Sequence, residues 1–434
     1  MLEAFSTYFH ENYPLEESTK IGVATSGGVD SMVLCHMLLK LNISFTVLHC
    51  NFHLRGEASD GDAKMVKCFA ENHRLEFEQI DFQTREYAAE NGISIQMAAR
   101  ELRYDWFHKI KKEKNLSWIA TAHHLDDDIE TVLINLGRGT GIRGMMGIPD
   151  KANGFIRPLL GFSKEQIIAY AKKQAVEWRE DNTNQSTDYL RNYLRLKVIP
   201  AWKEQVPDLE IGFISSKKHI SQSIQLQNDY LRLVKNQVWS ESEFGVQIDL
   251  KKLENFPNNS TLLYELLSPY GFTAWEDVYN LIESQSGKMV LSPTHRLIKD
   301  RETFLLAKKN TKCSITSVLL RDSQEIKNLA VVLDKINAKA FKLETKRTIF
   351  VTEKKLRFPL ELRLWKPGDF FYPAGMTGKK KLSKYFKDQK YSILEKEAIW
   401  VLCSENNIVW VVGHRMDRRF LPTNAEDAKI EISI

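Results

Sequence analysis

The six residues SGGVDS (26–31) lie between two apolar stretches of different kinds. Residues 21–24 contain β-branched side chains and are bounded by polar residues, which predicts a buried strand. Residues 32–41 keep apolar side chains over successive turns, which predicts a helix packed against a sheet. We therefore expect SGGVDS to form a strand-to-helix loop, whose backbone N–H groups and helix dipole face one point and make an anion site.

The residue types within this loop suit a bound phosphate. Gly27 and Gly28 permit a tight turn and a close approach of phosphate to the backbone. The hydroxyls of Ser26 and Ser31 add donors, and Asp30 can hold a divalent cation against the phosphates. An ordinary turn with a helix N-cap uses the same residue types, so the flanking strand and helix carry the argument. No G-K-[ST] follows, which excludes the usual P-loop.

Composition narrows the class of protein. The chain has 434 residues, 27% charged and 43% hydrophobic, which is typical of a folded protein with two or three domains. No apolar run reaches the ~18 residues of a transmembrane helix, and the first residues lack the pattern of a signal peptide. Five scattered cysteines without a C-x-x-C pair argue against a zinc ribbon, an iron–sulfur site and a disulfide framework. We expect a reduced, cytoplasmic protein without a membrane partner.

Strand and helix patterns alternate from residue 20 to about residue 160. Further strand candidates lie at 44–52, 76–82 and 117–121, with helical patterns between them. Such alternation predicts an α/β fold with a doubly wound, Rossmann-like parallel sheet, whose ligands lie at the carboxyl ends of the strands. The loop SGGVDS lies at such an end. We assign this domain to residues 1–207.

Two further domains are expected in the rest of the chain. Helical patterns dominate 208–312 and predict a helical middle domain. After residue 341, short β-rich runs are separated by Pro, Gly and Lys. This pattern predicts a small α+β domain at 313–434, whose compact part begins near residue 355.

A second polar cluster, AHHLDDDIE (122–130), follows the fourth predicted strand. Its two histidines end the strand and its three aspartates open a helix, where Asp127 and Glu130 share one face. Acidic residues also suit the dipole at any helix N-terminus. Next to a phosphate loop, however, the cluster predicts a site for magnesium or for a substrate ammonium group. The histidine spacing differs from H-E-x-x-H and argues against zinc.

Two arginine pairs have two interpretations each. Arg191 and Arg195 are four residues apart, so a helix would present both on one side. They could contact phosphates of a nucleotide or an RNA, or they could form salt bridges at the surface. Arg100 and Arg103 leave the same alternatives open.

The C-terminal region is the most basic part of the chain. Residues 341–400 contain 15 Lys and Arg against 7 Asp and Glu, in a chain whose net charge is +5. This bias suggests a polyanionic partner, although a solvated lysine surface is common. Lysines beside Tyr385 and Phe386 are typical of contact with a nucleic-acid backbone and of base stacking. These lysines are Lys379, Lys380, Lys381, Lys384, Lys387 and Lys390.

SGGVDS resembles the PP-loop of the N-type ATP pyrophosphatases, which cleave ATP to AMP and pyrophosphate while they adenylate a substrate. The chain then shows, in order, AHHLDDDIETVLINLGRGTGIRGMMGI, IRPLLGF, EDNTN with YLRNYLR, and LWKPGDFFYPAG with KKLSKYF. This series resembles the tRNA(Ile)-lysidine synthetase family over nearly the whole chain, least clearly in the middle.

The resemblance implies a ligase that forms a C–N bond and uses ATP and Mg²⁺. The family joins the ε-amine of free L-lysine to C2 of the wobble cytidine in tRNA(Ile) with the anticodon CAU. The reaction passes through an adenylated cytidine and converts codon specificity from AUG to AUA.

The resemblance also assigns roles to residues of this chain. Asp127 and Glu130 would bind lysine and act in catalysis together with Asp30 and His123. The ATP loop, with Asp30 near the metal, would consist of Ser26, Gly27, Gly28, Val29, Asp30 and Ser31. By the same resemblance, residues 1–207 would form the PP-loop catalytic domain, and the domains 208–312 and 313–434 would bind tRNA. The candidate contacts to tRNA are Arg191, Arg195, Lys379, Lys380, Lys381 and Lys384.

Other classes of protein explain parts of the pattern. A PP-loop tRNA thiolase, or another adenylating tRNA-modifying enzyme, shares the ATP chemistry, but the cytidine-thiolating type carries C-x-x-C pairs. An amidating ligase for small molecules gives no reason for a basic C-terminal domain. A non-enzymatic RNA-binding protein explains the lysines but not SGGVDS with HHLDDDIE. The oligomeric state stays open, with a homodimer as one alternative.

Overall fold

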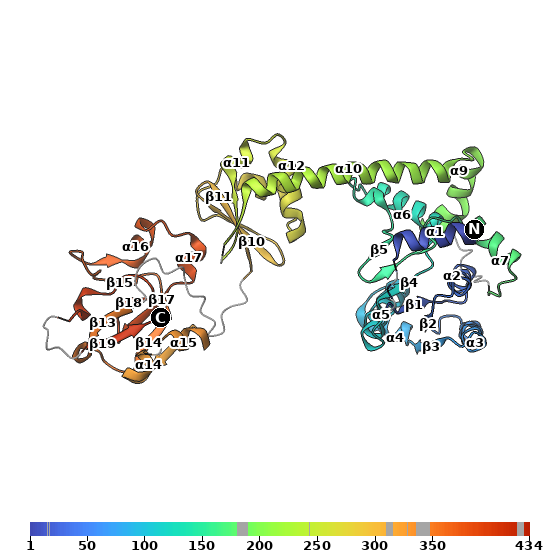
Figure 1. Cartoon of the computed structure of the whole chain (residues 1–434). Helices are drawn as coiled ribbons and strands as arrows, with labels where there is room; N and C mark the ends of the chain where they lie inside the picture. The colour runs from blue at the N-terminus through green and yellow to red at the C-terminus, as the bar shows by residue number, and fades with distance from the viewer. Residues whose placement is uncertain are drawn as a thin grey trace. The chain divides into compact units, whose positions relative to one another are not determined.

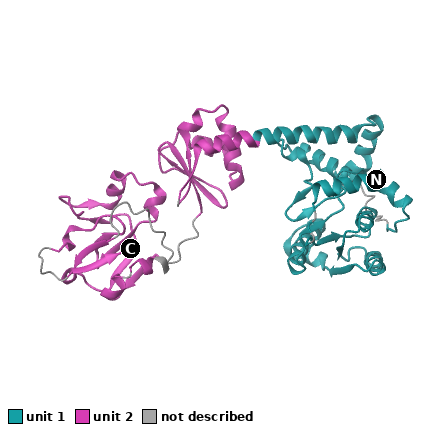
Figure 2. Cartoon of the chain, in the orientation of Figure 1, with its two compact units in different colours: residues 1–227 teal, residues 228–434 magenta. Residues whose placement is uncertain are grey.

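The computed structural model describes residues 1–14, 16, 18–179, 190–242, 244–309, 316–327, 329–335, 348–422 and 429–434. These residues form two compact units, 1–227 and 228–434 (Figure 2). Among the described helices, none combines the length and the apolar character that a membrane crossing requires. The boundary predicted between residues 312 and 313 falls outside the described residues.

The first unit is built on a six-stranded sheet in the order β3-β2-β1-β4-β6-β5 (Figure 1). All neighbouring strands are parallel except β5, which pairs antiparallel with β6. The predicted α/β fold with a parallel sheet is thereby confirmed. The strands are β1 (Ile21–Ala24), β2 (Phe45–Asn51), β3 (Glu76–Asp81), β4 (Trp118–Ala120), β5 (Lys151–Ala152) and β6 (Phe155–Ile156).

Helices cover both faces of this sheet. Val47 of β2 lies in one apolar core with α1, α2 and α7, whereas its neighbour Leu48 lies in another core with α5. Because side chains alternate along a strand, the two cores occupy opposite faces, as expected for a doubly wound sheet. The helices are α1 (Leu2–Asn12), α2 (Val29–Lys40), α3 (Glu57–Asn72), α4 (Thr84–Asn91), α5 (Ile95–Glu113), α6 (Leu125–Gly137), α7 (Lys164–Lys173), α8 (Leu190–Tyr193) and α9 (Ile199–Gln205).

The middle region contains the expected helices and also a sheet that the sequence patterns did not predict. The helices are α10 (Leu209–Val238), α11 (Leu250–Glu254), α12 (Asn259–Leu267) and α13 (Trp275–Asn280). The antiparallel sheet has the order β7-β8-β11-β10-β9. Leu263 of α12 packs with Ile248 and Phe304 of this sheet, so helices and strands share one core. The strands are β7 (Trp239–Ser242), β8 (Gly245–Asp249), β9 (Met289–Leu291), β10 (His295–Asp300) and β11 (Thr303–Lys308).

The C-terminal region is α+β, as predicted, but its packed part begins well before residue 355. Strand β12 pairs with β14, and β13 pairs with β19, so residues from both sides of position 355 form one core. Leu320 and Ile349 are buried in that core together with Leu360. The strands are β12 (Ser317–Leu320), β13 (Thr348–Thr352), β14 (Leu360–Leu364), β15 (Phe370–Phe371), β16 (Lys380–Lys381), β17 (Trp400–Ser404), β18 (Asn407–Val411) and β19 (Lys429–Ser433).

Four short helices complete this region. One apolar contact and one ion pair connect it to the middle sheet. Leu394 packs against Ile298 and Leu305, and Arg296 forms an ion pair with Glu397 at 2.5 Å. The helices are α14 (Ser323–Lys327), α15 (Leu329–Lys335), α16 (Leu382–Asp388) and α17 (Ile393–Glu397).

The turn that follows α6 is held by a buried aspartate. Oδ1 of Asp128 accepts a hydrogen bond from the backbone N–H of Ile148 at 2.6 Å, and its other oxygen pairs with Lys217 of α10. Gly147 precedes this contact with φ +63°. A Cβ at position 147 would lie 2.0 Å from Oδ1 of Asp128. The turn therefore requires glycine at this position.

We predict that Gly147→Ala destabilises the first unit by about 2 kcal/mol or more, because it adds both a clash and backbone strain. Gly141→Ala is the matched control, since a Cβ at Gly141 would meet no atom within 4 Å. Urea melts of both variants measure the difference. Equal stability of the two variants would contradict this account of the turn.

Candidate functional site

The loop SGGVDS follows β1 and opens α2, as its sequence predicts. Gly27 adopts φ +88°, and Gly28 is extended and caps the helix. The hydroxyl of Ser31 donates to the carbonyl of Gly28 at 3.0 Å and accepts from the backbone N–H of Ser26 at 3.1 Å. The loop is thus tied to the first turn of α2. Its glycines and the N-terminus of the helix form the kind of cradle that binds phosphate.

Asp30 connects the loop to two other segments. Its Oδ1 accepts a hydrogen bond from Nζ of Lys164, the first residue of α7, at 2.6 Å. Nε2 of His124 lies 4.0 Å from the same oxygen and 3.5 Å from Oδ2 of Asp127. His124 therefore lies between the loop and the acidic helix, a position that the HH pair in the sequence did not assign to either ring. The catalytic role of His123 stays a prediction.

Asp127 and Glu130 lie together, as their spacing implies, and both contact arginine. The side chain of Glu130 has no exposed surface. Nε of Arg191 and Nε of Arg195 donate to its two oxygens, at 2.7 and 2.6 Å. Nη2 of Arg195 also donates to Oδ1 of Asp127 at 2.7 Å. A buried carboxylate without such partners would be strongly destabilising.

Neighbouring charges lower the pKa of Asp127 more than burial raises it. Burial by itself raises the pKa of Asp127, but His124 and Arg195 hold the pKa below its usual value. Burial lowers the pKa of Arg195, whereas its hydrogen bond to Glu130 raises that pKa above the ordinary range. Asp127 and Arg195 are therefore both charged at neutral pH.

Arg191 and Arg195 thus take the salt-bridge alternative within this structure. Arg191 belongs to α8, and Arg195 belongs to the π-helical turn Leu194–Val198 that follows it. Such turns are rare and occur often at functional sites. Contact of the two arginines with RNA phosphates stays a prediction.

A cavity of about 140 Å³ lies beside the acid pair. It is lined by His124, Asp126, Glu130, Lys164, Glu165, Arg195, Ile199, Pro200 and Lys203. Polar groups from α6, α7 and α9 converge on it, so it can accept a small charged ligand.

Three carboxylates at one side of this cavity surround a lysine. Asp126, Glu165 and Glu210 offer oxygens within 4.8 Å of one another, close enough to share a cation. Nζ of Lys203 lies among them, at 2.5, 3.0 and 2.7 Å. Burial lowers the pKa of Lys203, but these three hydrogen bonds raise it above the ordinary range. The cation at this point is therefore the ammonium group of Lys203.

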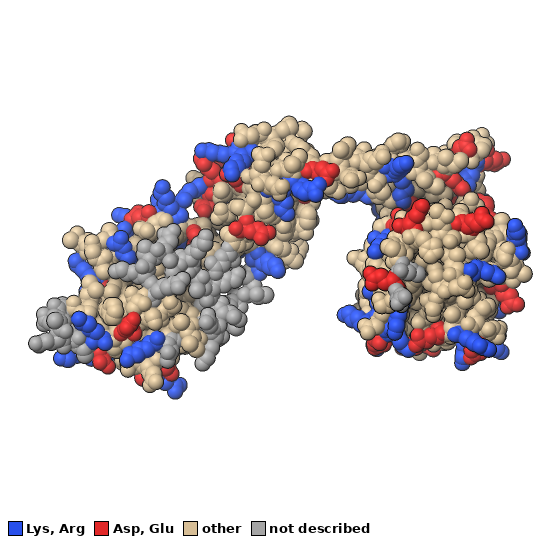
Figure 3. Space-filling model, in the orientation of Figure 1, with Lys and Arg blue, Asp and Glu red and all other residues tan. Residues whose placement is uncertain are grey.

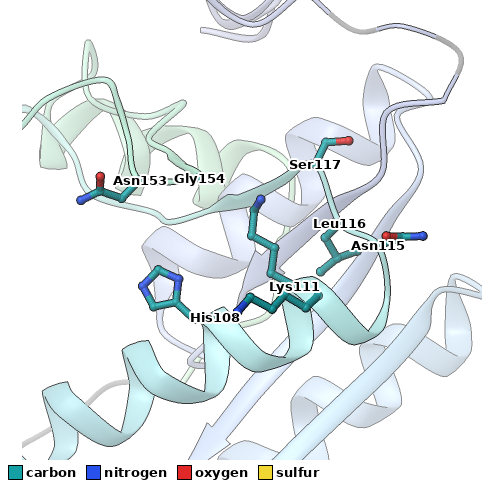
Figure 4. Close-up of a pocket in the computed structure, with 8 residues that line it drawn as sticks. His108, Lys111, Asn115, Leu116, Ser117, Asn153 and Gly154 are labelled. Carbon is teal, nitrogen blue, oxygen red and sulfur yellow. The ribbon is translucent and has the colours of Figure 1, made fainter. Parts of the chain in front are cut away.

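A second cavity, of about 450 Å³, lies at the opposite edge of the sheet. Figure 4 shows Lys111 of α5 extended beside Gly154, where a Cβ would lie 2.8 Å from Cε of Lys111. Ser117, just before β4, also lines it, whereas the loop SGGVDS follows the carboxyl end of β1. The second cavity is thus separate from the acidic and phosphate-binding groups.

The lysine-rich stretch differs in part from its sequence interpretation. Tyr385 and Phe386 are 3% and 0% exposed, because they form the inner side of α16, so they are not available for base stacking. Lys379 instead lies over the ring of Phe370 at 3.5 Å, and Lys380 pairs with Asp388 at 2.8 Å. On the face drawn in Figure 3, acidic and basic side chains are interspersed over both units. Contact of Lys379, Lys380, Lys381 and Lys384 with tRNA stays a prediction.

Comparisons with known proteins agree with this arrangement. Residues 1–202 match the family described as PP-loop domain. Residues 241–309 match the TilS substrate binding domain, and residues 360–432 match the TilS substrate C-terminal domain. The three matches follow one another in the order expected from the sequence.

Curated relatives cover almost the entire chain. The tRNA(Ile)-lysidine synthase of Parabacteroides distasonis is 41% identical over 97% of this chain and 96% of its own length. That of Bacteroides thetaiotaomicron is 36% identical over 95% of each chain. Among solved structures, the U34-tRNA thiolase NcsA from Methanococcus maripaludis gives a TM-score of 0.42 at 16% identity, over 50% of this chain and 79% of its own. On the two full-length relatives, the chain belongs to the tRNA(Ile)-lysidine synthase family.

Proposed function

We propose that this protein uses ATP to adenylate the wobble cytidine of tRNA(Ile) with the anticodon CAU and then joins free L-lysine to C2. As a member of the family it is a ligase that forms a C–N bond. One observation carries the assignment of residues: His124 lies between Asp30 of the phosphate loop and Asp127 of the acid pair. An activated base held near the loop would therefore be close to an amine held by the acids.

The activation step requires a site for the triphosphate. The C2 oxygen of cytidine attacks the α-phosphorus of ATP, the bond from that phosphorus to the β-bridging oxygen breaks, and pyrophosphate leaves. The N–H groups of residues 26–31 and the N-terminus of α2 would bind the phosphates. Asp30 is about one-third exposed and offers the hard oxygen ligand that Mg²⁺ prefers. The ion, when bound, would neutralise phosphate charge.

The second step requires a site for lysine. Asp127 and Glu130 would bind the ε-amino group of lysine and orient it. After the group loses a proton, its nitrogen attacks C2 of the adenylated cytidine, the bond from C2 to the adenylate oxygen breaks, and AMP leaves. In the structure their oxygens hold Arg191 and Arg195. A lysine ammonium group would therefore replace hydrogen bonds that the arginines now donate.

His123 is the histidine to which the resemblance gives a part in catalysis. Its Nδ1 lies 2.9 Å from the hydroxyl of Thr121. Burial lowers the pKa of His123 to about 4, although the charge of Asp127 opposes this change. The imidazole is therefore neutral at pH 7, but a pKa this low makes it a weak base. A part for His123 in deprotonating the amine stays a prediction.

Three of the described cysteines, Cys35, Cys50 and Cys403, give no support to sulfur chemistry. Burial raises the pKa of Cys35 and Cys50 to about 12 and that of Cys403 to about 11, so these thiols are protonated at neutral pH. A thiolate is the reactive form of cysteine. Together with the full-length relatives, this favours the lysine ligase over a thiolase.

A cytoplasmic location and a homodimer stay predictions.

The test of the reaction uses purified protein, ATP, Mg²⁺, lysine and an unmodified tRNA(Ile) transcript. We expect the digested wobble nucleoside to gain the mass of one lysine residue. Asp30→Ala should abolish the gain, and Asp127→Asn should raise KM for lysine at least about tenfold, because a charged hydrogen bond is removed. Asp105→Asn, at an exposed position on α5, is the control. Pyrophosphate release without a mass gain would exclude the wobble cytidine as the acceptor of lysine. It would still support the cleavage of ATP to AMP and pyrophosphate.

The lowered pKa of His123 predicts a loss of stability in acid. Between about pH 6.5 and pH 4 the unfolded chain binds a proton that the folded chain does not, so stability falls as pH falls. The loss attributable to this group approaches about 3 kcal/mol. Urea melts at several pH values should show a weaker pH dependence for His123→Gln than for the wild type. His10→Gln, at an exposed site, should keep the wild-type slope.

We predict that the lysines of residues 379–381 contribute to the affinity for tRNA and not to the KM for lysine. Replacing Lys379, Lys380 and Lys381 by Gln should weaken tRNA binding and reduce its dependence on salt, by ~0.9 in the logarithmic slope for each phosphate that is no longer neutralised. KM for lysine should stay within about twofold of the wild type, since the acid pair is untouched. The same change at the exposed Lys67, Lys109 and Lys172, outside the two domains predicted to bind tRNA, serves as control. An unchanged salt slope would remove these lysines from the interface.

A further inference from the structure

Two arginines meet on one buried carboxylate next to the phosphate loop. The side chain of Asp62, on α3, is only 10% exposed. Its Oδ2 accepts a hydrogen bond from Nη2 of Arg55 at 2.6 Å, and its Oδ1 accepts one from Nε of Arg179 at 2.6 Å. Each arginine contacts a different oxygen, so one carboxylate fixes both guanidinium groups. The three side chains together carry a net positive charge.

This cluster is attached directly to the loop. The backbone N–H of Arg179 donates to the carbonyl of Gly27 at 3.0 Å. Cβ of Asp62 lies 3.5 Å from the point that a Cβ at Gly27 would occupy. Arg55 follows β2, which is parallel to β1, so the segments after both strands lie at the same edge of the sheet. The guanidinium groups are therefore at the edge where the phosphates of ATP would bind.

The guanidinium group of Arg179 packs closely against α3 at Gly61. A Cβ at Gly61 would lie 3.0 Å from Nη2 and 3.1 Å from Cζ of Arg179. The guanidinium group thus lies across the backbone of α3. The side chains of Arg179 and Arg55 nevertheless remain 47% and 29% exposed, so a ligand can reach them from solvent.

We propose that Arg55 and Arg179 bind the β- and γ-phosphates of ATP and the departing pyrophosphate, with Asp62 as their positioning residue. The inference rests on the proposed function, because it takes the nucleotide and the cleaved bond from it. When the bond between the α-phosphorus and the bridging oxygen breaks, negative charge accumulates on pyrophosphate. Two guanidinium groups held in place would stabilise that charge. They supply the side-chain cations that the loop SGGVDS itself lacks.

The test measures binding of magnesium pyrophosphate to the full chain by calorimetry, and its inhibition of the reaction. Arg179→Gln and Arg55→Gln should each weaken pyrophosphate binding about tenfold or more, because each variant lacks one charged hydrogen bond. KM for ATP should rise, while KM for lysine stays within about twofold, since the acid pair is untouched. Arg85→Gln, at an exposed position on α4, is the matched control.

Gly61→Ala tests the same contact without removing a charge. The added methyl group should shift the guanidinium group of Arg179 by a few tenths of an ångström. We expect this shift to weaken pyrophosphate binding, although both arginines are retained. If Arg179→Gln does not fold, as judged by circular dichroism, Gly61→Ala decides the proposal. Asp62→Asn should raise KM for ATP, because the two guanidinium groups lose the carboxylate that holds them in place.

The outcomes separate this inference from the proposed function. Unchanged pyrophosphate binding in a folded Arg179→Gln variant, with lysidine still formed, would overturn the inference and keep the function. Weakened pyrophosphate binding in variants of an enzyme that makes no lysidine would support the phosphate contact and exclude the lysine ligase. A loss of stability alone, with pyrophosphate binding intact, would assign a structural role to the cluster.

Discussion

The buried carboxylate of Glu130 determines where residues 190–198 lie in the first unit. Removing one partner of a buried ion pair costs about 3–5 kcal/mol, so this carboxylate requires cations beside it. Arg191 and Arg195 provide them from segments that follow a long connection from α7. Residues 190–198 must therefore lie against α6. The position of the cavity beside α6 follows from this contact.

The same electrostatic rule organises the neighbouring aspartates. Asp126 pairs with Lys203 of α9, and Asp128 pairs with Lys217 of α10, so acids in the first turn of one helix hold different segments. The apolar residues Leu125 and Ile129 bury the other side of the helix. Packing thus fixes where α6 lies, and ion pairs fix what surrounds its first turns.

Local sequence patterns predicted the elements of the first unit well. Contacts between segments far apart in the chain could not be predicted from such patterns. The strand before SGGVDS and the helix after it follow from patterns within a few residues. The position of His124 between Asp30 and Asp127 and the salt bridges of Arg195 depend on segments far apart in the chain. The middle sheet was missed because β8 pairs with the distant β11, and its short strands carry no strict alternation. Phe386 is buried by packing that a lysine-rich stretch does not reveal.

Charge balance links the two substrates of the proposed reaction. An acid pair without cations would place two negative charges next to a cavity of about 140 Å³, which is unfavourable. The arginines keep this region neutral, and a lysine ammonium group would have to replace at least part of their contacts. A displaced guanidinium group would need another anion, and an RNA phosphate is the anion that the second substrate brings. Lysine and tRNA would then bind more favourably together than separately, since each satisfies a charge that the other exposes.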